Sequence, residues 1–241
     1  MIQFYAPDIA VNPVLPEGES LHCAKVLRMQ PGATVEVIDG KGGAYTCTLL
    51  EAHHKHALVR VDEVRRRPLP WNYRLTVAVA PTKHLDRMEW LTEKLTEVGI
   101  NRIVPALCDR SERRELKTER LEKIAVSAMK QSLKAVLPEV APMTPVRRII
   151  EECDSEQRFI CYCDDAIERR VLAREVKPGA DVTILIGPEG DFSPAEVELA
   201  LGRGFIPVTL GDNRLRTETA ALFAASTIHV INQLSSTHQT D

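Results

Sequence analysis

Residues 182–201 read VTILIGPEGDFSPAEVELAL, and this stretch decides the fold class of the chain. Val182–Ile186 are apolar or β-branched, so they predict a short buried strand. In the loop that follows, Gly187–Gly190, the two glycines let the backbone approach a ligand closely and a proline stiffens the turn. Ser193 is placed to cap a helix that has Pro194 at its first position, and Glu196 completes a capping box. The stretch therefore predicts a strand, a glycine loop and a helix in succession.

The same alternation of strand and helix extends through the chain after residue 73. A helix with Met88, Leu91, Leu95 and Val98 on one face is expected to end at Gly99. We expect further strands at 75–80, 103–107, 159–163 and 207–210, and further helices at 118–133, 167–174, 194–201 and 218–234. Strands that alternate with helices predict an α/β fold with a mainly parallel sheet.

The first 64 residues instead have the pattern of a small β-rich unit. Ser20 is expected to cap a short helix over 21–29, and the glycine-rich turn at 40–43 is expected to join two strands of a hairpin. The expected strands are 34–39, 44–52 and 57–64. The basic, proline-broken run 65–70 is the best candidate for a linker. We therefore expect two domains, residues 1–70 and residues 71–241.

Composition excludes several classes of protein. Of the 241 residues, 44% are hydrophobic and 27% are charged, which excludes a disordered, collagenous or coiled-coil chain. No apolar run approaches the roughly 18 residues of a membrane span, and the N-terminus lacks the features of an export signal. We expect a soluble cytoplasmic protein in which the six cysteines stay reduced. The histidines at 53, 54 and 56 have no cysteine or carboxylate at ligand spacing, so no metal site is expected.

The net charge of −3 hides an uneven distribution of charge. Residues 110–148 carry 10 basic and 5 acidic side chains, whereas residues 149–241 carry 8 basic and 16 acidic ones. Phosphate binding depends on the local electrostatic field rather than on the total charge. The basic segment is therefore either a surface for nucleic acid or a solvated helix face on which arginines and lysines alternate with glutamates.

A second unusual loop lies between the last expected strand and the last expected helix. Residues 210–220 read LGDNRLRTETA, in a place where ligands bind in open α/β sheets. Thr217 is suited to cap the helix that follows, and Glu218 is favourable to the helix dipole. Neither of these structural roles accounts for Arg214 and Arg216, which a simple turn between a strand and a helix does not need.

Together the two loops resemble a known family. The Gly187-Pro188-Glu189-Gly190 loop, followed 26 residues later by Arg216-Thr217-Glu218-Thr219-Ala220, resembles the C-terminal signature of the SPOUT methyltransferases. Within them it is similar to the 16S ribosomal RNA (uracil-N3)-methyltransferase family. Further motifs that resemble this family follow one another in order: His22-x3-Val26-Leu27-Arg28, Lys83, Asp86-Arg87-Met88, Lys94, Glu97-x-Gly99, Ser111-Glu112-Arg113 and Gln131-Ser132. Three positions depart from it, because Asp191 replaces a common glycine, Lys134 a usual arginine, and Asn213-Arg214 an arginine–aliphatic pair.

The resemblance implies an architecture and an activity. It implies an RNA-binding, PUA-like N-terminal β-barrel and a C-terminal SPOUT domain tied in a deep trefoil knot. It also implies a homodimer that binds S-adenosyl-L-methionine in the knot loops and methylates N3 of a uridine in the 16S rRNA of the small ribosomal subunit. Because N3 must lose its proton to react, the site needs a cation or N–H groups that face the charge developing on O2 or O4. No residue is identified as the general base, and water is one candidate.

The residues implied for the site fall into three groups. The catalytic candidates are Arg216, which would stabilise the uracil anion, and Glu218 and Glu189, which would orient polar groups. The alternative for Arg216 is an ion pair with one of these glutamates that holds the loops together. The cofactor-binding candidates are Ile186, Gly187, Pro188, Glu189, Gly190, Leu210, Gly211, Leu215, Arg216, Thr217, Thr219 and Ala220. The RNA-binding candidates are His22, Arg28, Arg65, Arg66, Arg67, Lys83, Arg113 and Lys134.

Two other functions stay open at this point. One is a SPOUT methyltransferase that acts on tRNA or on a ribose 2′-OH, which the N-terminal HxxxVLR pattern disfavours. The other is a ribosome-assembly factor that has the fold without the catalysis. The complete glycine loop and the complete RTETA segment argue against the second alternative, because a protein that only binds needs no cofactor loop.

Overall fold

The computed structural model describes residues 2–163 and 167–236. The chain divides into two compact units, each with its own sheet. The first unit comprises Met1–Trp71 and Val126–Leu137, and the second comprises Asn72–Ala125 and Pro138–Asp241. The first unit therefore contains a segment from the middle of the chain besides the expected N-terminal residues.

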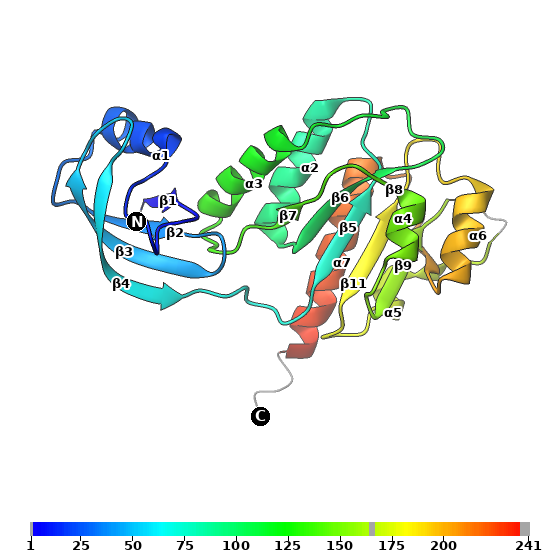
Figure 1. Cartoon of the computed structure of the whole chain (residues 1–241). Coiled ribbons are helices and arrows are strands. Elements are labelled where there is room, and N and C mark those ends of the chain that lie inside the picture. Colours follow the sequence, from blue (N-terminus) through cyan, green and yellow to red (C-terminus); the bar gives the residue numbers. More distant parts are fainter. Residues whose placement is uncertain (1, 164–166, 237–241) are drawn as a thin grey trace. The chain divides into compact units, whose positions relative to one another are not determined.

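The first unit is built on a four-stranded sheet in the order β1-β2-β3-β4 (Figure 1). Its strands are β1 (Gln3–Tyr5), β2 (Thr34–Ile38), β3 (Gly43–Glu51) and β4 (Leu58–Arg66). β1 pairs with β2 in parallel, while β2 with β3 and β3 with β4 pair antiparallel. The predicted hairpin is confirmed, since Ile38 lies opposite Ala44 across the glycine-rich turn.

The helical segment of this unit differs from the prediction. An α-helix, α1 (Glu17–Leu21), is followed directly by a π-helical turn, η1 (His22–Val26). Ser20 lies inside α1 and is no N-cap, so the predicted helix start is wrong. Its buried hydroxyl donates to Leu15 O at 2.8 Å and accepts from Ala57 N at 2.9 Å. This hydroxyl satisfies backbone groups of the chain before α1 and of the loop before β4, which local sequence does not reveal.

The linker predicted over residues 65–70 starts too early, because its first two residues belong to a strand. Residues 65 and 66 belong to β4, and the guanidinium of Arg67 donates two hydrogen bonds to Glu36, at 2.6 and 2.9 Å. The segment 126–137 completes the unit, because Met129 and Ala135 pack with Ile38 and Ala44. It contains the end of α3 (Glu119–Gln131), a helix that begins in the second unit.

The second unit confirms the predicted α/β fold. Its strands are β5 (Leu75–Val79), β6 (Arg102–Leu107), β7 (Glu139–Val140), β8 (Thr144–Pro145), β9 (Gln157–Cys161), β10 (Arg170–Val171), β11 (Val182–Ile186) and β12 (Ile206–Thr209). The sheet order is β10-β12-β9-β11-β5-β6-β7, with β8 paired to β6. Every strand pair recorded for this sheet among the described residues is parallel. The carboxyl ends of its strands therefore all point to one edge of the sheet.

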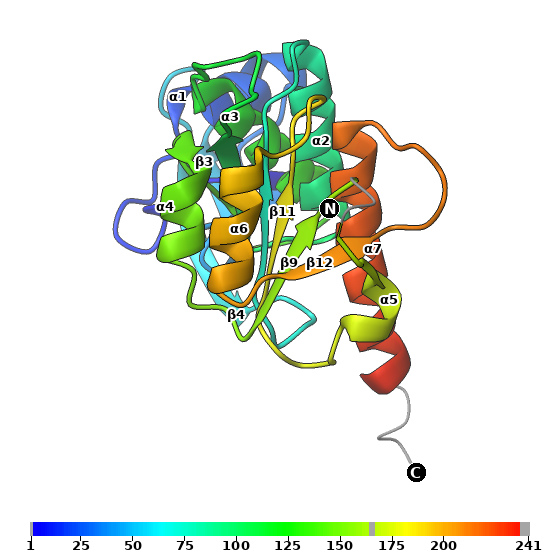
Figure 2. The same cartoon turned by 90° about the vertical axis from the view of Figure 1, so that its right-hand side faces the viewer.

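Helices cover both faces of this sheet (Figure 2). One face carries α2 (Leu85–Val98) and α7 (Thr217–Ser236), which contact each other, and the other carries α4 (Val146–Glu151) and α6 (Pro194–Gly202). The helix predicted over 167–174 is confirmed only at its end, over residues 172–174. In the described part of this range the chain forms β10 and the four-residue α5 (Leu172–Glu175), because Arg170 pairs with Val208 and its backbone joins the sheet. Residues 164–166 lie outside the described residues.

A buried histidine connects α7 to the rest of the unit. Nε2 of His229 lies 2.7 Å from Gly99 O and therefore donates to it, while Nδ1 lies 2.5 Å from the hydroxyl of Tyr73. Burial raises the pKa of Tyr73 to about 12, so this hydroxyl keeps its proton at physiological pH and can donate it to Nδ1.

Tyr73→Phe removes this donor and leaves the buried Nδ1 without this hydrogen bond. We expect the free energy of unfolding to fall by about 1–3 kcal/mol, because a buried polar atom that loses its partner is costly. Urea unfolding followed by circular dichroism measures the change. An unchanged transition midpoint and slope would show that the hydrogen bond contributes nothing to stability.

Candidate functional site

A cavity of about 700 Å³ opens at the carboxyl ends of β9, β11 and β12. The order of the sheet places these three strands side by side, so the loops that follow them meet there. The described lining residues are Arg87, Cys161, Tyr162, Cys163, Arg169, Ile186, Gly187, Pro188, Glu189, Asp191, Val208, Thr209, Leu210, Gly211, Asp212, Asn213, Arg214, Leu215, Arg216, Thr217, Glu218 and Ala220. The volume is within the range of small-molecule sites.

The two loops that the sequence singled out are in direct contact. The hydroxyl of Thr217 donates to Gly187 O at 3.3 Å. Thr217 is the first residue of α7, so its hydroxyl joins the glycine loop Gly187–Gly190 to the RTETA segment Arg216–Ala220. Its hydrogen bond goes to that loop, and not to the N–H groups that an N-cap would satisfy.

Most of the predicted cofactor residues line this cavity, but Gly190 and Thr219 do not. The carbonyl of Gly190 accepts from Arg110 at 2.9 Å, and a Cβ on Gly190 would lie 3.5 Å from that of Arg110. A Cβ on Gly187 would lie 3.0 Å from a ring carbon of the buried Phe192. Gly187 is therefore the glycine of this loop whose lack of a side chain the packing requires.

The glutamates of the two loops differ in environment. Glu189 is exposed, whereas the side chain of Glu218 is only 8% exposed and lies 3.7 Å from Nε of Arg87. Oε2 of Glu218 is buried and has no hydrogen-bond partner in the described part of the chain. Arg216 is exposed and forms no ion pair with a described residue. The ion pair expected as the alternative role of Arg216 is made instead by Arg87, a cavity residue that the sequence presents only within the Asp86-Arg87-Met88 motif.

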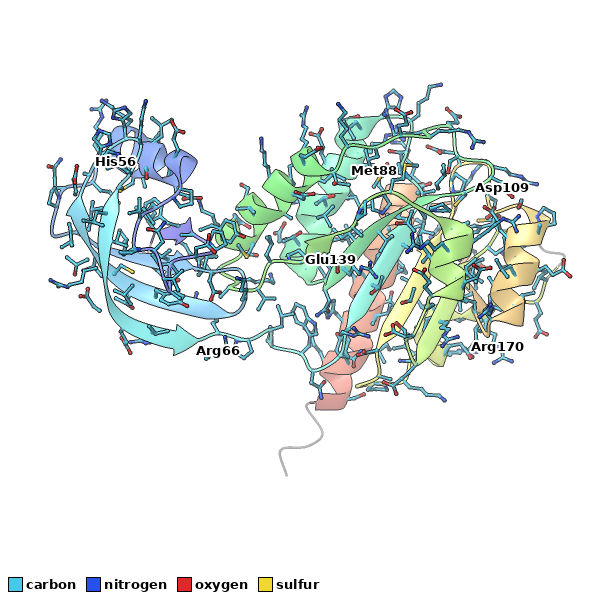
Figure 3. All side chains as sticks on the ribbon, in the orientation of Figure 1. His56, Arg66, Met88, Asp109, Glu139 and Arg170 are labelled. Carbon is cyan, nitrogen blue, oxygen red and sulfur yellow. The ribbon has the colours of Figure 1, made fainter. Side chains whose placement is uncertain are left out.

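A hydrogen-bond network fixes the glycine loop from outside the cavity. The predicted capping box of Ser193 and Glu196 is present at the start of α6. Glu196 is 1% exposed, and its carboxylate accepts from Ser193 N and from Asp109 N, both at 2.8 Å. The hydroxyl of Ser193 donates to Asp109 at 2.6 Å and thereby lowers the pKa of that carboxyl. Figure 3 labels Asp109, in the loop after β6 and beside the start of α6.

Asp191 stands where a glycine is common in the family that the sequence resembles, and it adopts a backbone conformation typical of glycine. Its φ of +62° lies in the left-handed region that favours glycine. Its carboxylate accepts from Phe192 N at 2.8 Å and from Cys163 N at 3.0 Å. Asp191 therefore ties the glycine loop to the chain that follows β9. Burial raises the pKa values of the Cys161 and Cys163 thiols in the cavity wall, so neither is an activated nucleophile.

The predicted RNA-binding residues are distributed over both units. His22, Arg28, Arg65, Arg66, Arg67 and Lys134 belong to the first unit, and Lys83 and Arg113 to the second. Several of them are engaged within the chain: Arg65 and Arg67 bind Glu63 and Glu36, Lys83 forms an ion pair with Glu112, and Arg113 donates to Thr82 O and Lys83 O. Arg28 is exposed and has a φ of +51°, directly after the π-helical turn. Arg28 and Arg66 therefore present the more available cations.

The cavity suits a cofactor that carries several hydrogen-bond donors. Residues of two glycine-containing loops line it, and the buried Oε2 of Glu218 lacks a partner that such a ligand would supply. S-adenosyl-L-methionine, with ammonium, hydroxyl and amino groups, fits this chemistry. Among residues 2–163 and 167–236, no group of three or more His, Cys, Asp or Glu side chains is placed to hold a metal ion. No described helix is long and apolar enough to cross a membrane.

Two family models match the chain. The model for an RNA methyltransferase domain matches residues 69–229, and the model for an RNA methyltransferase PUA domain matches residues 15–62. Among curated proteins, the chain is 30% identical to the ribosomal RNA small subunit methyltransferase E of Synechocystis over 214 residues. This match covers 86% of the chain and 69% of the relative.

Solved structures are similar over almost the whole chain. A probable rRNA methyltransferase from Porphyromonas gingivalis has a TM-score of 0.92 and 45% identity, and covers 98% of this chain and 100% of its own. A ribosomal RNA small subunit methyltransferase E from Neisseria gonorrhoeae, bound to S-adenosyl methionine, has a TM-score of 0.78 and 28% identity. This match covers 96% of this chain and 98% of its own.

Glu196→Gln tests the network outside the cavity. An amide has only one acceptor oxygen, so one of the two backbone N–H groups loses its partner and the glycine loop loosens. We expect the affinity for S-adenosylhomocysteine to fall about tenfold, or roughly 1.4 kcal/mol, measured by isothermal titration calorimetry. Glu122→Gln is the matched control, because Glu122 accepts from the hydroxyl of Thr118 at the start of α3 and not near the cavity. Equal affinities in the two variants would contradict the role of Glu196.

Proposed function

The chain belongs to the RNA methyltransferase family, and from this membership we propose that it methylates N3 of a uridine in 16S ribosomal RNA with S-adenosyl-L-methionine as donor. The observation that carries the proposal is the cavity where the glycine loop and the RTETA segment meet. Relatives named as small-subunit rRNA methyltransferases favour ribosomal RNA over tRNA as the substrate. The complete cofactor cavity favours an enzyme over a binding-only assembly factor.

The cofactor would be held mainly by backbone groups at the ends of β11 and β12. Ile186, Gly187, Leu210, Gly211 and Leu215 line the cavity there. We further propose that the two motif loops belong to a trefoil knot. The hydrogen bond between Thr217 and Gly187, which joins these loops, supports this topology. Bound in this cavity, S-adenosylmethionine supplies a methyl group on a positively charged sulfur.

The site must favour loss of the proton on uracil N3. Once the proton has passed to water, the N3 lone pair forms the N–CH3 bond while the CH3–S bond breaks and its electron pair stays on sulfur. The exposed guanidinium of Arg216 at the cavity would stabilise the negative charge on the uracil carbonyls. A closed site that orients the two reactants would supply much of the rate.

RNA binding is assigned to the first unit and to the basic segment 110–134. The match of residues 15–62 to an RNA methyltransferase PUA domain supports residues 1–70 as the RNA-binding domain and 71–241 as the methyltransferase domain. Arg28 and Arg66, whose side chains are exposed, are the strongest phosphate-binding candidates. Aromatic residues are only 5% of the chain, so phosphate and shape recognition should dominate over base stacking.

We further propose a cytoplasmic homodimer that needs no metal. Among the described side chains of α7, Phe223, Val230 and Leu234 are large, apolar and 49–60% exposed, spaced as one stripe of the helix. A second copy of the chain would cover this stripe. α6 lies on the opposite face of the sheet, so the proposed contact is restricted to α7.

Mass spectrometry of rRNA nucleosides tests the activity. Small ribosomal subunits that lack the modification are incubated with the protein and S-adenosylmethionine, digested and analysed for N3-methyluridine. Formation of N3-methyluridine at one position of 16S rRNA supports the proposal. Methylation of ribose or of tRNA, or binding of the cofactor without any methylation, contradicts it.

Arg216→Lys tests the catalytic role of Arg216. A point charge does not reproduce the planar fork of arginine, so the single-turnover rate should fall about 10²–10³-fold, or roughly 3–4 kcal/mol. The affinity for S-adenosylhomocysteine and the melting temperature should stay near their wild-type values. If affinity and melting temperature fall together, Arg216 is structural; if turnover is near wild type, Arg214 becomes the catalytic candidate.

Phe223→Asp combined with Val230→Asp tests the dimer. Two charges on the exposed stripe should oppose burial against a second copy, so light scattering at micromolar concentration should give a monomeric mass. The wild type should give twice that mass. Val11→Asp is the control, since Val11 is an exposed apolar residue of the first unit. A monomeric wild type contradicts the proposed dimer.

A further inference from the structure

Arg87 is an arginine of the cavity wall that forms no hydrogen bond through its guanidinium with any described residue. It lies near the start of α2, while every other described lining residue lies between positions 161 and 220. Its side chain is only 32% exposed, and its Nε lies 3.7 Å from Glu218, which is an ion pair but beyond hydrogen-bond distance. A partly buried guanidinium with five donors and no hydrogen bond to the described chain is suited to a ligand that supplies acceptors.

The other arginines of the cavity are placed differently. Arg169 donates to the carbonyls of Tyr162 and Cys163, so its guanidinium is already hydrogen-bonded to the cavity wall. Arg214 and Arg216 are exposed residues of the loop before α7. Arg87 is thus the cavity arginine that combines partial burial with unused hydrogen-bond donors in the described structure.

Glu218 holds Arg87 at the start of α7. Glu218 follows Arg216 by two residues, so both guanidinium groups border the N-terminus of a 20-residue helix, whose dipole adds positive potential. Two arginines and a helix N-terminus adjoin Glu218 here, while the other carboxylates of the described lining, Glu189, Asp191 and Asp212, belong to the loops. This end of the cavity is therefore suited to an anion.

The chemistry of the proposed reaction supplies such an anion. When uracil N3 loses its proton to water, the negative charge is shared by O2 and O4, which lie on either side of N3. A single cation reaches one of these oxygens, whereas two cations that approach from different elements reach both. We propose that Arg87, positioned by Glu218, is a second catalytic residue that binds one carbonyl oxygen of the uracil anion while Arg216 binds the other.

This inference rests on the proposed function and makes a specific kinetic prediction. If Arg87 stabilises the anion, Arg87→Gln should lower the single-turnover rate at pH 7 about 10²-fold. The deficit should shrink as the pH rises, because hydroxide then removes the N3 proton without help. It should also shrink with 5-fluorouridine as substrate, because fluorine withdraws electron density and makes the N3 proton more acidic.

The experiment uses the full-length protein and small subunits reconstituted with 16S rRNA transcribed with either uridine or 5-fluorouridine. Arg87→Gln and Glu218→Gln are compared with wild type from pH 6 to pH 9, and S-adenosylhomocysteine affinity and melting temperature are measured for each. Arg102→Gln is the matched control, because Arg102 forms an ion pair with Glu139 at 3.1 Å on the same sheet, outside the cavity lining. We expect affinity within threefold of wild type, a deficit that depends on pH and on fluorine, and a smaller deficit of the same kind in Glu218→Gln.

Three results would overturn the inference while leaving the proposed function in place. The first is a loss of S-adenosylhomocysteine affinity of tenfold or more in Arg87→Gln, which would assign the guanidinium to the carboxylate of the cofactor. The second is a deficit of the same size at every pH and with both nucleosides, which would assign it a structural role. The third is a rate equal to that of Arg102→Gln. A wild-type protein that forms no N3-methyluridine would overturn the proposed function and this inference together.

Discussion

The parallel pairing of β9, β11 and β12 is the constraint on which the site depends. Parallel strands end at the same edge of a sheet, so their exit loops are brought together although they are far apart in the sequence. The hydrogen bond from Thr217 to Gly187 closes the contact between the two motif loops. Asp191 adds the chain after β9 to the same edge through Cys163 N. The cavity is the space that these loops enclose.

The polar groups around this cavity are divided between support and function. Ser193, Glu196 and Asp109 have satisfied hydrogen bonds and hold the glycine loop in place from behind. The buried Oε2 of Glu218 and the guanidinium of Arg87, whose side chain is 32% exposed, lack such bonds within the described chain. A buried polar atom without a hydrogen bond costs stability, so Oε2 of Glu218 is a group at which the fold loses stability in favour of binding. This contrast is the physical basis for assigning Arg87 to the substrate.

The same distinction separates the basic residues expected to bind RNA. Charge counting treats all arginines alike, but an arginine that already holds a carboxylate or a carbonyl is less available to phosphate. Arg67 holds Glu36, and Arg113 holds the backbone of the loop between β5 and α2. Arg28 presents an exposed side chain from a left-handed backbone after a π-helical turn. Positive charge in the sequence therefore overstates the phosphate-binding surface.

The sequence by itself determined the features that depend on near neighbours in the chain. The strand Val182–Ile186, the capping box of Ser193 and Glu196, the end of α2 at Gly99 and the hairpin turn were all predictable, because each follows from apolar patterning or from turn and cap chemistry within a few residues. Tertiary structure decided the rest. Ser20 serves two distant loops instead of a helix end, residues 170–171 join a sheet instead of a helix, and segment 126–137 packs in the first unit. Arg87 reaches the cavity because β5 lies beside β11, whose paired residues are 107 positions away in the chain, and no local pattern contains that pairing.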